Sequence, residues 1–257
     1  MIKYHTGHEF DVRYDPVDHK YWLNKGDKLG EDEDIVQIPS VTRIIDSCFP
    51  KHLTDWAVKA GADAYLDTWN HSLEVSDRVE LITTAYKKIG EEAANIGWRV
   101  HNWLHMYITE AIPEKFESPE GGEKCIDAFL EWEKAHQIKW EEAERMVFFA
   151  PRALRYAGTA DALAVIDGQK FVVDFKTSKK IYKSYYLQVA AYASALNEEL
   201  GLVGKDKYQG MILRLDKESG KFQEKAFDIT DSVPVFWTCI ELKEWNSQRI
   251  GKLKYGE

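Results

Sequence analysis

A tight turn at Asp167-Gly168 is the feature that most constrains how this chain can fold. Asp-Gly is favoured by the two-residue type I′ turn of a β-hairpin, because both central residues of that turn need a positive φ. Two apolar runs flank the turn, at residues 160–166 and 169–175. Apolar residues occur at odd and even positions of both runs, so both faces should be buried. The sequence therefore predicts a hairpin at the centre of a sheet.

A two-residue turn also fixes the register, because residues whose numbers sum to 335 then face each other. Asp161 would face Asp174, and Lys176 would point to the same side because side chains alternate along a strand. Opposed like charges, about 4.5–5.5 Å apart at Cβ, destabilise a sheet. We therefore expect the two carboxylates to share a proton, pair with a cation or hold a metal ion. The alternative is a surface hairpin whose charged side chains are solvated.

Asp161, followed by Asp174-Phe175-Lys176, resembles the signature of the PD-(D/E)XK nuclease superfamily, and in particular its RecB-like branch, which contains mitochondrial and phage exonucleases. Other segments also resemble this branch, namely residues 38–42, 97–101, 156–161, 173–178 and 187–192. The resemblance implies an α/β fold in which a mixed central β-sheet is flanked by helices, as in restriction endonucleases. It also implies a helical arch region beside this core.

The resemblance further implies roles for individual residues. The catalytic residues would be Asp161, Asp174, Lys176 and Glu144. The metal ligands, for one or two Mg²⁺ or Mn²⁺ ions, would be His101, Asp161, Asp174 and the backbone carbonyl of Phe175. His105 lies one helical turn after His101 and is a rival for its role. Glu141 and Glu142 compete with Glu144, and a run of acids is more often a solvated helix end.

Contacts to DNA are expected from the segment after Lys176. Gln188 and Tyr192 lie four residues apart and share one face of a predicted helix at 184–200. In related nucleases such a pair contacts DNA or steadies the active site, although Gln188 could instead bond a strand carbonyl. Lysines alternate with tyrosines just before this helix, as suits phosphate neutralisation and base stacking. The further predicted DNA contacts are Thr177, Ser178, Lys179, Lys180 and Lys183. Their alternative interpretation is a solvated loop.

The net charge of −9 does not exclude nucleic-acid binding, because binding depends on where the cations lie. The chain has three scattered cysteines, which suits free thiols in a reducing compartment. An iron–sulfur cluster needs four cysteine ligands and is not expected. No apolar run is long enough to span a membrane, and the N-terminus lacks the character of a targeting peptide. We expect a cytoplasmic protein of a bacterium or a phage-infected host.

A single nuclease domain over residues 1–257 is predicted, without a linker between independent units. It comprises an N-terminal β element (1–40), a helical region (41–140) and a catalytic α/β core (141–257). Expected helices include 40–47, most of 51–110, 91–109, 125–136, 184–200 and 233–250. Expected core strands are 145–150, 160–166, 169–175, 208–215 and 221–228.

These features predict a metal-dependent DNA exonuclease that acts from a free end of single-stranded DNA in recombination, repair or replication. The aromatic residues of the helical region that could stack on bases are Trp56, Tyr65, Trp69 and Tyr86. A structure-specific endonuclease is one alternative, and a nuclease-like DNA-binding module without catalysis is a second. A metal-dependent hydrolase of small phosphates is a third. The sequence predicts no particular protein partner.

Overall fold

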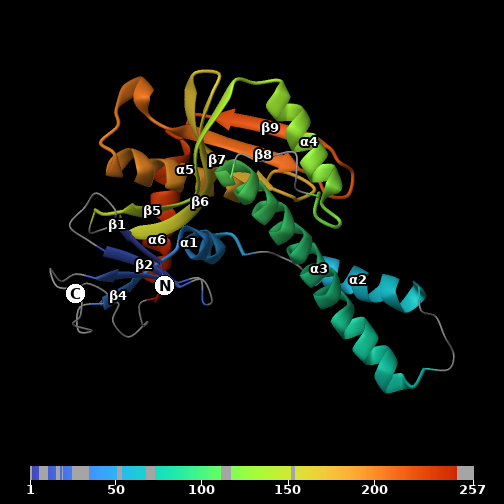
Figure 1. Ribbon diagram of the computed structural model, residues 1–257. Coiled ribbons are helices and arrows are strands. Elements are labelled where there is room, and N and C mark those ends of the chain that lie inside the picture. Colours follow the sequence, from blue (N-terminus) through green and yellow to red (C-terminus); the bar gives the residue numbers. More distant parts are fainter. Residues whose placement is uncertain are drawn as a thin grey trace, which may run out of the picture.

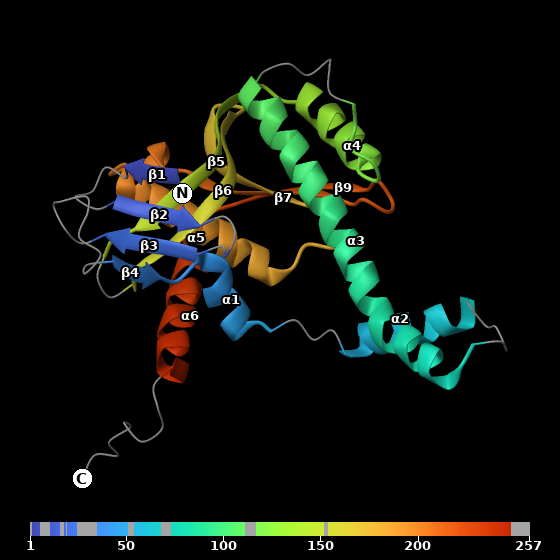
Figure 2. The same cartoon turned by 60° about the horizontal axis from the view of Figure 1, so that its bottom comes forward.

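The described part of the chain forms two sheets and a projecting helical arm (Figures 1 and 2). The computed structural model describes residues 2–5, 11–15, 18, 20–24, 35–50, 54–67, 73–110, 117–151 and 154–247. The α/β class with a mixed central sheet flanked by helices is confirmed. Within the described residues, none of the helices combines the length and the apolarity that crossing a bilayer requires.

The central sheet has five strands in the order in which they follow along the chain. They are β5 (Ile138–Phe149), β6 (Tyr156–Ile166), β7 (Gln169–Lys176), β8 (Gln209–Leu215) and β9 (Phe222–Phe227). Neighbouring strands are antiparallel except β7 and β8, which are parallel and are joined by helix α5 (Lys183–Glu199). Parallel neighbours end at the same edge of a sheet, so residues that follow β7 and β8 meet there.

The hairpin between β6 and β7 has the predicted turn and register. Asp167 has a φ of 49° and Gly168 a φ of 85°, as a type I′ turn requires. The paired residues run from Ile166–Gln169 to Ala162–Val173, and every pair sums to 335. One further step of the same register places Asp161 opposite Asp174. The Asp-Gly dipeptide was therefore sufficient to align the two strands.

Helices cover both faces of the central sheet and bury two apolar cores. One face packs against α1 (Val41–Cys48), α5 and α6 (Ser232–Ser247). The other face packs against α4 (Glu123–Lys134) and the C-terminal half of α3 (Val75–Glu110). Phe129 of α4 is fully buried in the second core and contacts four other aromatic rings edge-on or tilted. These two cores hold the hairpin rigidly from both sides.

The helical arm consists of α2 (Thr54–Asp67) and the N-terminal half of α3, which project away from the sheet (Figure 2). The two helices pack closely at Gly61, where a Cβ would lie 2.5 Å from the carbonyl oxygen of Ile82. Trp69, predicted as a base-stacking residue, lies outside the described residues. Trp56 is partly exposed and contacts Tyr86 edge-on, with ring centroids 6.3 Å apart.

The N-terminal element is a separate antiparallel sheet of four strands. They are β1 (Ile2–His5), β2 (Asp11–Asp15), β3 (Lys20–Asn24) and β4 (Ile35–Ile38). A third small core joins this sheet to the central one, with Leu23 and Phe148 fully buried in it. Ser40, which follows β4, forms an isolated β-bridge with Ala157 of β6 and so links the N-terminal segment to the central sheet.

Several element boundaries differ from the sequence prediction. The first core strand begins at Ile138 and not at residue 145, because a register shift between Trp140 and Glu142 hides its alternation. The helix expected at 125–136 ends at Lys134. The helix expected at 91–109 is the end of the 36-residue α3. Residues 248–250, expected to end the last helix, lie outside the described residues.

Candidate active site

Four predicted residues meet at the end of the central hairpin. Asp161 lies on β6, Asp174 and Lys176 lie on β7, and His101 comes from α3. We call these four side chains the hairpin-end cluster. Nδ1 of His101 is 3.4 Å from Oδ2 of Asp161, and Nζ of Lys176 is 2.7 Å from Oδ2 of Asp174. Each of the two aspartates therefore has a basic side chain beside it, His101 for Asp161 and Lys176 for Asp174.

Asp174 is the most deeply buried member of the cluster. Its residue surface is 0% exposed, and its Oδ1 accepts a hydrogen bond of 2.9 Å from Lys176 Nζ. Its Oδ2 lies close to the same ammonium group but receives no hydrogen bond. Burial raises the pKa of Asp174 to about 6, against the attraction of Lys176. Asp174 is therefore harder to ionise than an ordinary carboxyl group, although Lys176 favours its charged form.

Asp161 is in a more favourable position for a carboxylate. Burial on its own would raise the pKa of Asp161, but the charge and hydrogen bond of His101 outweigh it and lower the pKa. The backbone N–H of Phe175 also donates to Oδ2 of Asp161 at 2.8 Å. The two aspartates are therefore unequal, with Asp161 the more readily ionised.

His101 is the histidine that faces the cluster. Burial lowers the pKa of His101, but the negative charge of Asp161 more than compensates, so its pKa is raised. Its ring stands edge-on to Phe175, with the ring centroids 6.3 Å apart. The rival His105 instead has a buried Nδ1 without a hydrogen-bond partner in the described structure. The geometry therefore favours His101 over His105.

Lys176 carries a proton in this environment. Burial lowers the pKa of a lysine, but Asp174 and Asp161 together outweigh that effect and raise the pKa of Lys176. Its ammonium group also lies over the ring of Tyr185, 5.0 Å from the centroid. Lys176 therefore acts as a hydrogen-bond donor with a fixed positive charge.

Glu144 lies on β5, the strand that pairs with β6 on the side away from β7. The pairs Ala143–Ala162 and Arg145–Ala160 flank it, so the register places Glu144 opposite Asp161. Its φ of 50° is unusual for a residue with a side chain. The rivals have other partners, because Glu141 accepts a hydrogen bond from Tyr208 and Glu142 pairs with Arg145. Of the three acids, Glu144 is therefore the one beside the cluster.

Members of the hairpin-end cluster line two separate cavities. The first, of about 300 Å³, is lined by Glu144 and Asp161 and by several hydroxyl groups, those of Tyr14, Tyr21, Ser40, Thr42, Thr159 and Tyr192. The second, of about 390 Å³, is lined by His101 and Lys176 and reaches Trp56 on the arm. A chain-like ligand that crossed the cluster would enter both cavities.

Gln188 and Tyr192 form the predicted pair on α5. Nε2 of Gln188 donates to the hydroxyl oxygen of Tyr192 at 3.0 Å. The Tyr192 ring occupies the space beside Gly158, where a Cβ would lie 2.3 Å from ring atom Cε1. This contact brings α5 against the strand that carries Asp161. The pair therefore packs against the strand that carries Asp161, and Tyr192 also lines the first cavity.

The residues expected to contact DNA fall into two groups. Thr177, Ser178 and Lys179 line the second cavity beside Lys176. Lys180 and Lys183 are exposed but are not part of the cavity wall. Only the first three are thus brought to the cluster.

Arg214 is a charged residue of this region that the sequence prediction missed. It is the register partner of Lys176 on the neighbouring strand β8, and it is only 6% exposed. A charged residue inside the apolar run 210–215 was the available signal, because buried arginines are rare without a partner.

The residues of the cluster fit a divalent ion. Carboxylate and imidazole ligands suit Mg²⁺ or Mn²⁺, and the buried Oδ2 of Asp174 is an acceptor without a hydrogen bond. Among the described residues, however, no three His, Cys, Asp or Glu side chains already converge as a ligand set. The ammonium of Lys176 lies against Asp174 instead. The three cysteines are free thiols.

Comparisons with known proteins add little to this geometry. No family model matches the chain, and no curated protein matches it. Among solved structures, the crystal structure of SSO0001 is similar over 81% of this chain and 86% of that chain, with 10% identity and a TM-score of 0.33. A likeness at this level carries no argument about function.

Proposed function

We propose that this chain is a metal-dependent deoxyribonuclease that hydrolyses phosphodiester bonds as an exonuclease. It would act from a free end of single-stranded DNA in recombination, repair or replication. The observation that carries the proposal is the fully buried Asp174, which lies beside Asp161, Lys176 and His101 at the open end of a hairpin. The expected compartment is the cytoplasm, which suits free thiols.

The roles of the residues follow from their environments. Asp161 and Asp174 would supply carboxylate oxygens, and His101 an imidazole nitrogen, to one or two Mg²⁺ or Mn²⁺ ions. A divalent ion at this position lowers the pKa of a bound water and neutralises charge that develops on the phosphate. The carbonyl oxygen of Phe175 is a further ligand implied by the family resemblance.

Lys176 and Glu144 would act on the substrate and on water. Because Lys176 keeps its proton, it can donate a hydrogen bond to a non-bridging phosphate oxygen and stabilise negative charge there. Glu144 would accept a hydrogen bond from a water molecule in the first cavity, which it lines together with Asp161. These two residues would thus approach the phosphodiester from opposite sides of the cluster.

The preference for a single strand rests on the second cavity. Trp56 from the arm lines it together with three lysines and two acids, so an aromatic ring and an excess of cations border one space. Unpaired bases stack on such rings while the cations neutralise phosphates. Paired bases are stacked inside a duplex and would not reach Trp56. We therefore favour single-stranded DNA as the substrate.

The proposal is tested by cleavage of matched linear and circular single-stranded DNA, with label at either end. Digestion of the linear form alone, with Mg²⁺ or Mn²⁺ and not with EDTA, is expected. Asp174→Ala and Lys176→Ala should abolish cleavage, whereas Asp127→Asn, at an exposed position of α4, should cleave normally. Cutting of the circle would make the protein an endonuclease. DNA binding without cutting would make it a binding module, and cutting of nucleotides alone a small-phosphate hydrolase.

A further inference from the structure

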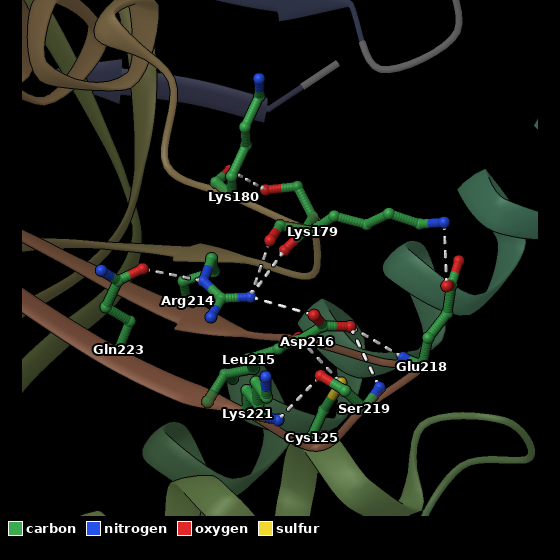
Figure 3. Close-up of polar contacts among 11 residues, drawn as sticks. Cys125, Lys179, Lys180, Arg214, Leu215, Asp216, Glu218, Ser219, Lys221 and Gln223 are labelled. Carbon is green, nitrogen blue, oxygen red and sulfur yellow. Dashed lines mark hydrogen bonds and ion pairs between the residues drawn. The ribbon is translucent and has the colours of Figure 1, made fainter. Parts of the chain in front are cut away.

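A buried ion pair lies one strand away from Lys176 and is not used in the proposed chemistry. Arg214 on β8 is 6% exposed, and Asp216, two residues later, is 7% exposed. Nη1 of Arg214 donates to Oδ2 of Asp216 at 3.1 Å (Figure 3). Because β7 and β8 are parallel and Arg214 is paired with Lys176, both charges lie at the same edge of the sheet.

The guanidinium group of Arg214 holds the segment that follows Lys176. Its Nη1 donates to the carbonyl oxygens of Ser178 at 3.3 Å and Lys179 at 3.2 Å. Its Nε donates to Oε1 of Gln223 on β9 at 3.1 Å, which fixes the plane of the group. Residues 177–180 lie beyond the end of β7 and have no ladder to hold them. Arg214 therefore supplies hydrogen bonds to the backbone of this segment in place of those of a β-ladder.

Asp216 organises the opposite wall of the same cavity. Its Oδ1 accepts the backbone N–H groups of Glu218 at 3.0 Å and Ser219 at 3.2 Å, which shapes the turn between β8 and β9. From this turn, Lys217 Nζ donates to the carbonyl oxygen of Ala93 on α3 at 2.7 Å. The ion pair therefore links the segment after Lys176, the β8–β9 turn and the helix that carries His101.

A gain in stability is a weak explanation for this pair. The cost of removing two charges from water largely cancels their attraction, so apolar residues would serve a core equally well. An arginine is distinguished instead by its planar fork, which can donate to several acceptors in fixed directions. In this site, the acceptors include two successive backbone carbonyls next to the hairpin-end cluster.

We infer that Arg214 is a positioning residue for substrate binding, which holds residues 177–179 so that their side chains line the cavity that faces the DNA backbone. This inference rests on the proposed function. Lys176 itself is fixed by the β7 ladder and by Asp174, so Arg214 acts on binding and not on the chemical step. The pair Lys179–Glu218 is exposed and contributes little to this arrangement.

The first test compares Arg214→Lys with the wild type. Lysine keeps a positive charge beside Asp216, but it is one bond shorter and lacks the Nε that Gln223 orients, so the fold should survive while the two carbonyls are released. We expect KM for single-stranded DNA to rise about tenfold with kcat within about threefold, since uniform binding is lost. Partial unfolding would instead lower the apparent kcat and leave KM unchanged, and that result would overturn the inference.

A second variant and a control guard against misfolding. Arg214→Met with Asp216→Asn removes both charges together and should raise KM by a similar factor. Asp127→Asn, at an exposed position of α4 that lines neither cavity, removes one charge far from the segment and should leave KM unchanged. In EDTA, the salt dependence of DNA binding should become shallower in the double variant, by about 0.7 in log–log slope for each phosphate that is no longer neutralised. A slope equal to that of the wild type would count against the inference.

Hydrogen exchange separates this inference from the proposed function. In Arg214→Lys, exchange of the amides of residues 177–182 should rise roughly tenfold while that of β6 and β7 stays the same. If the wild type neither binds nor cleaves DNA, the proposed function fails, but a local rise would still show that Arg214 holds this segment. Unchanged exchange in this segment, or a rise throughout the sheet, would refute the positioning role.

Discussion

Replacement of Gly158 by alanine tests how the strand of Asp161 and helix α5 fit together. A Cβ at Gly158 would lie 2.3 Å from Cε1 and 3.0 Å from Cδ1 of Tyr192, whereas ordinary contact begins at 3.4 Å. The ring would therefore have to move by about 1.1 Å. Tyr192 is 3% exposed and is hydrogen-bonded to Gln188, so it has little free space.

Overpacking of this kind costs about 1–3 kcal/mol. For a chain of this length, a loss of ~2 kcal/mol lowers the midpoint of thermal unfolding by roughly 4–8 °C. Urea unfolding of the wild type and Gly158→Ala measures the free energy directly. Two further backgrounds locate the cause. Tyr192→Phe keeps the ring, so the cost should persist, whereas Tyr192→Leu removes the ring atoms in contact and should reduce the cost to below about 0.5 kcal/mol.

The clash would be refuted as the cause if Gly158→Ala cost the same in the Tyr192→Leu background as in the wild type. A neutral Gly158→Ala would also refute it. The tests are informative only if m-values stay constant, because a change in m would indicate an altered unfolded state.

Three other predictions concern the metal, acid stability and a helix cap. Mn²⁺ at about 100 times its Kd should stabilise the chain by ~2.7 kcal/mol in thermal unfolding, and Asp161→Asn should abolish this gain. The pKa of Asp216 is lowered because hydrogen bonds, including one from Arg214, outweigh the effect of burial. The ionised Asp216 therefore stabilises the fold above about pH 4, and this stabilisation is lost as the pH falls through the lower pKa of the folded state. Asp216→Asn should lower the free energy of unfolding in urea by ~1–3 kcal/mol at pH 7 and by progressively less towards pH 3. Ser40→Ala removes the acceptor for the Arg43 N–H at the start of α1 and should cost ~1 kcal/mol by the same measurement.

The central hairpin could be predicted because its information is local. Two residues, Asp167 and Gly168, set the turn, and the turn alone aligned the carboxylates. The start of α1 at Ser40 followed from a cap that is also local. The Gln188–Tyr192 contact followed from helical spacing. These features need no knowledge of the rest of the fold.

Other features depend on tertiary structure, and local sequence patterns did not decide them: Glu144 and His101 were favoured over their neighbours only by the family resemblance, and Arg214 was missed. The choice of Glu144 over its neighbours depends on a positive φ within a strand, which no local pattern indicates. The choice of His101 over His105 depends on how α3 is rotated against the sheet. The pairing of Arg214 with Lys176 depends on a parallel crossover through α5, which brings together residues 38 positions apart. Each needs a contact between elements that are distant in sequence.

Helix α3 is mechanically a lever. Its 36 residues form one continuous rod of about 54 Å. The hydrogen bond from Lys217 reaches α3 at Ala93. The helix extends about 27 Å from Ala93 back to Val75 and about 12 Å from Ala93 on to His101. If α3 turned as a rigid rod about that contact, a shift of about 3 Å at its outer tip would move His101 by about 1.3 Å, against the packing of the fully buried Val100 and Leu104. Displacements near 1 Å are enough to change a reaction rate about a hundredfold. Under the proposed function, a bound DNA strand that displaced the arm would therefore change the geometry of the hairpin-end cluster to the extent that this packing gives way.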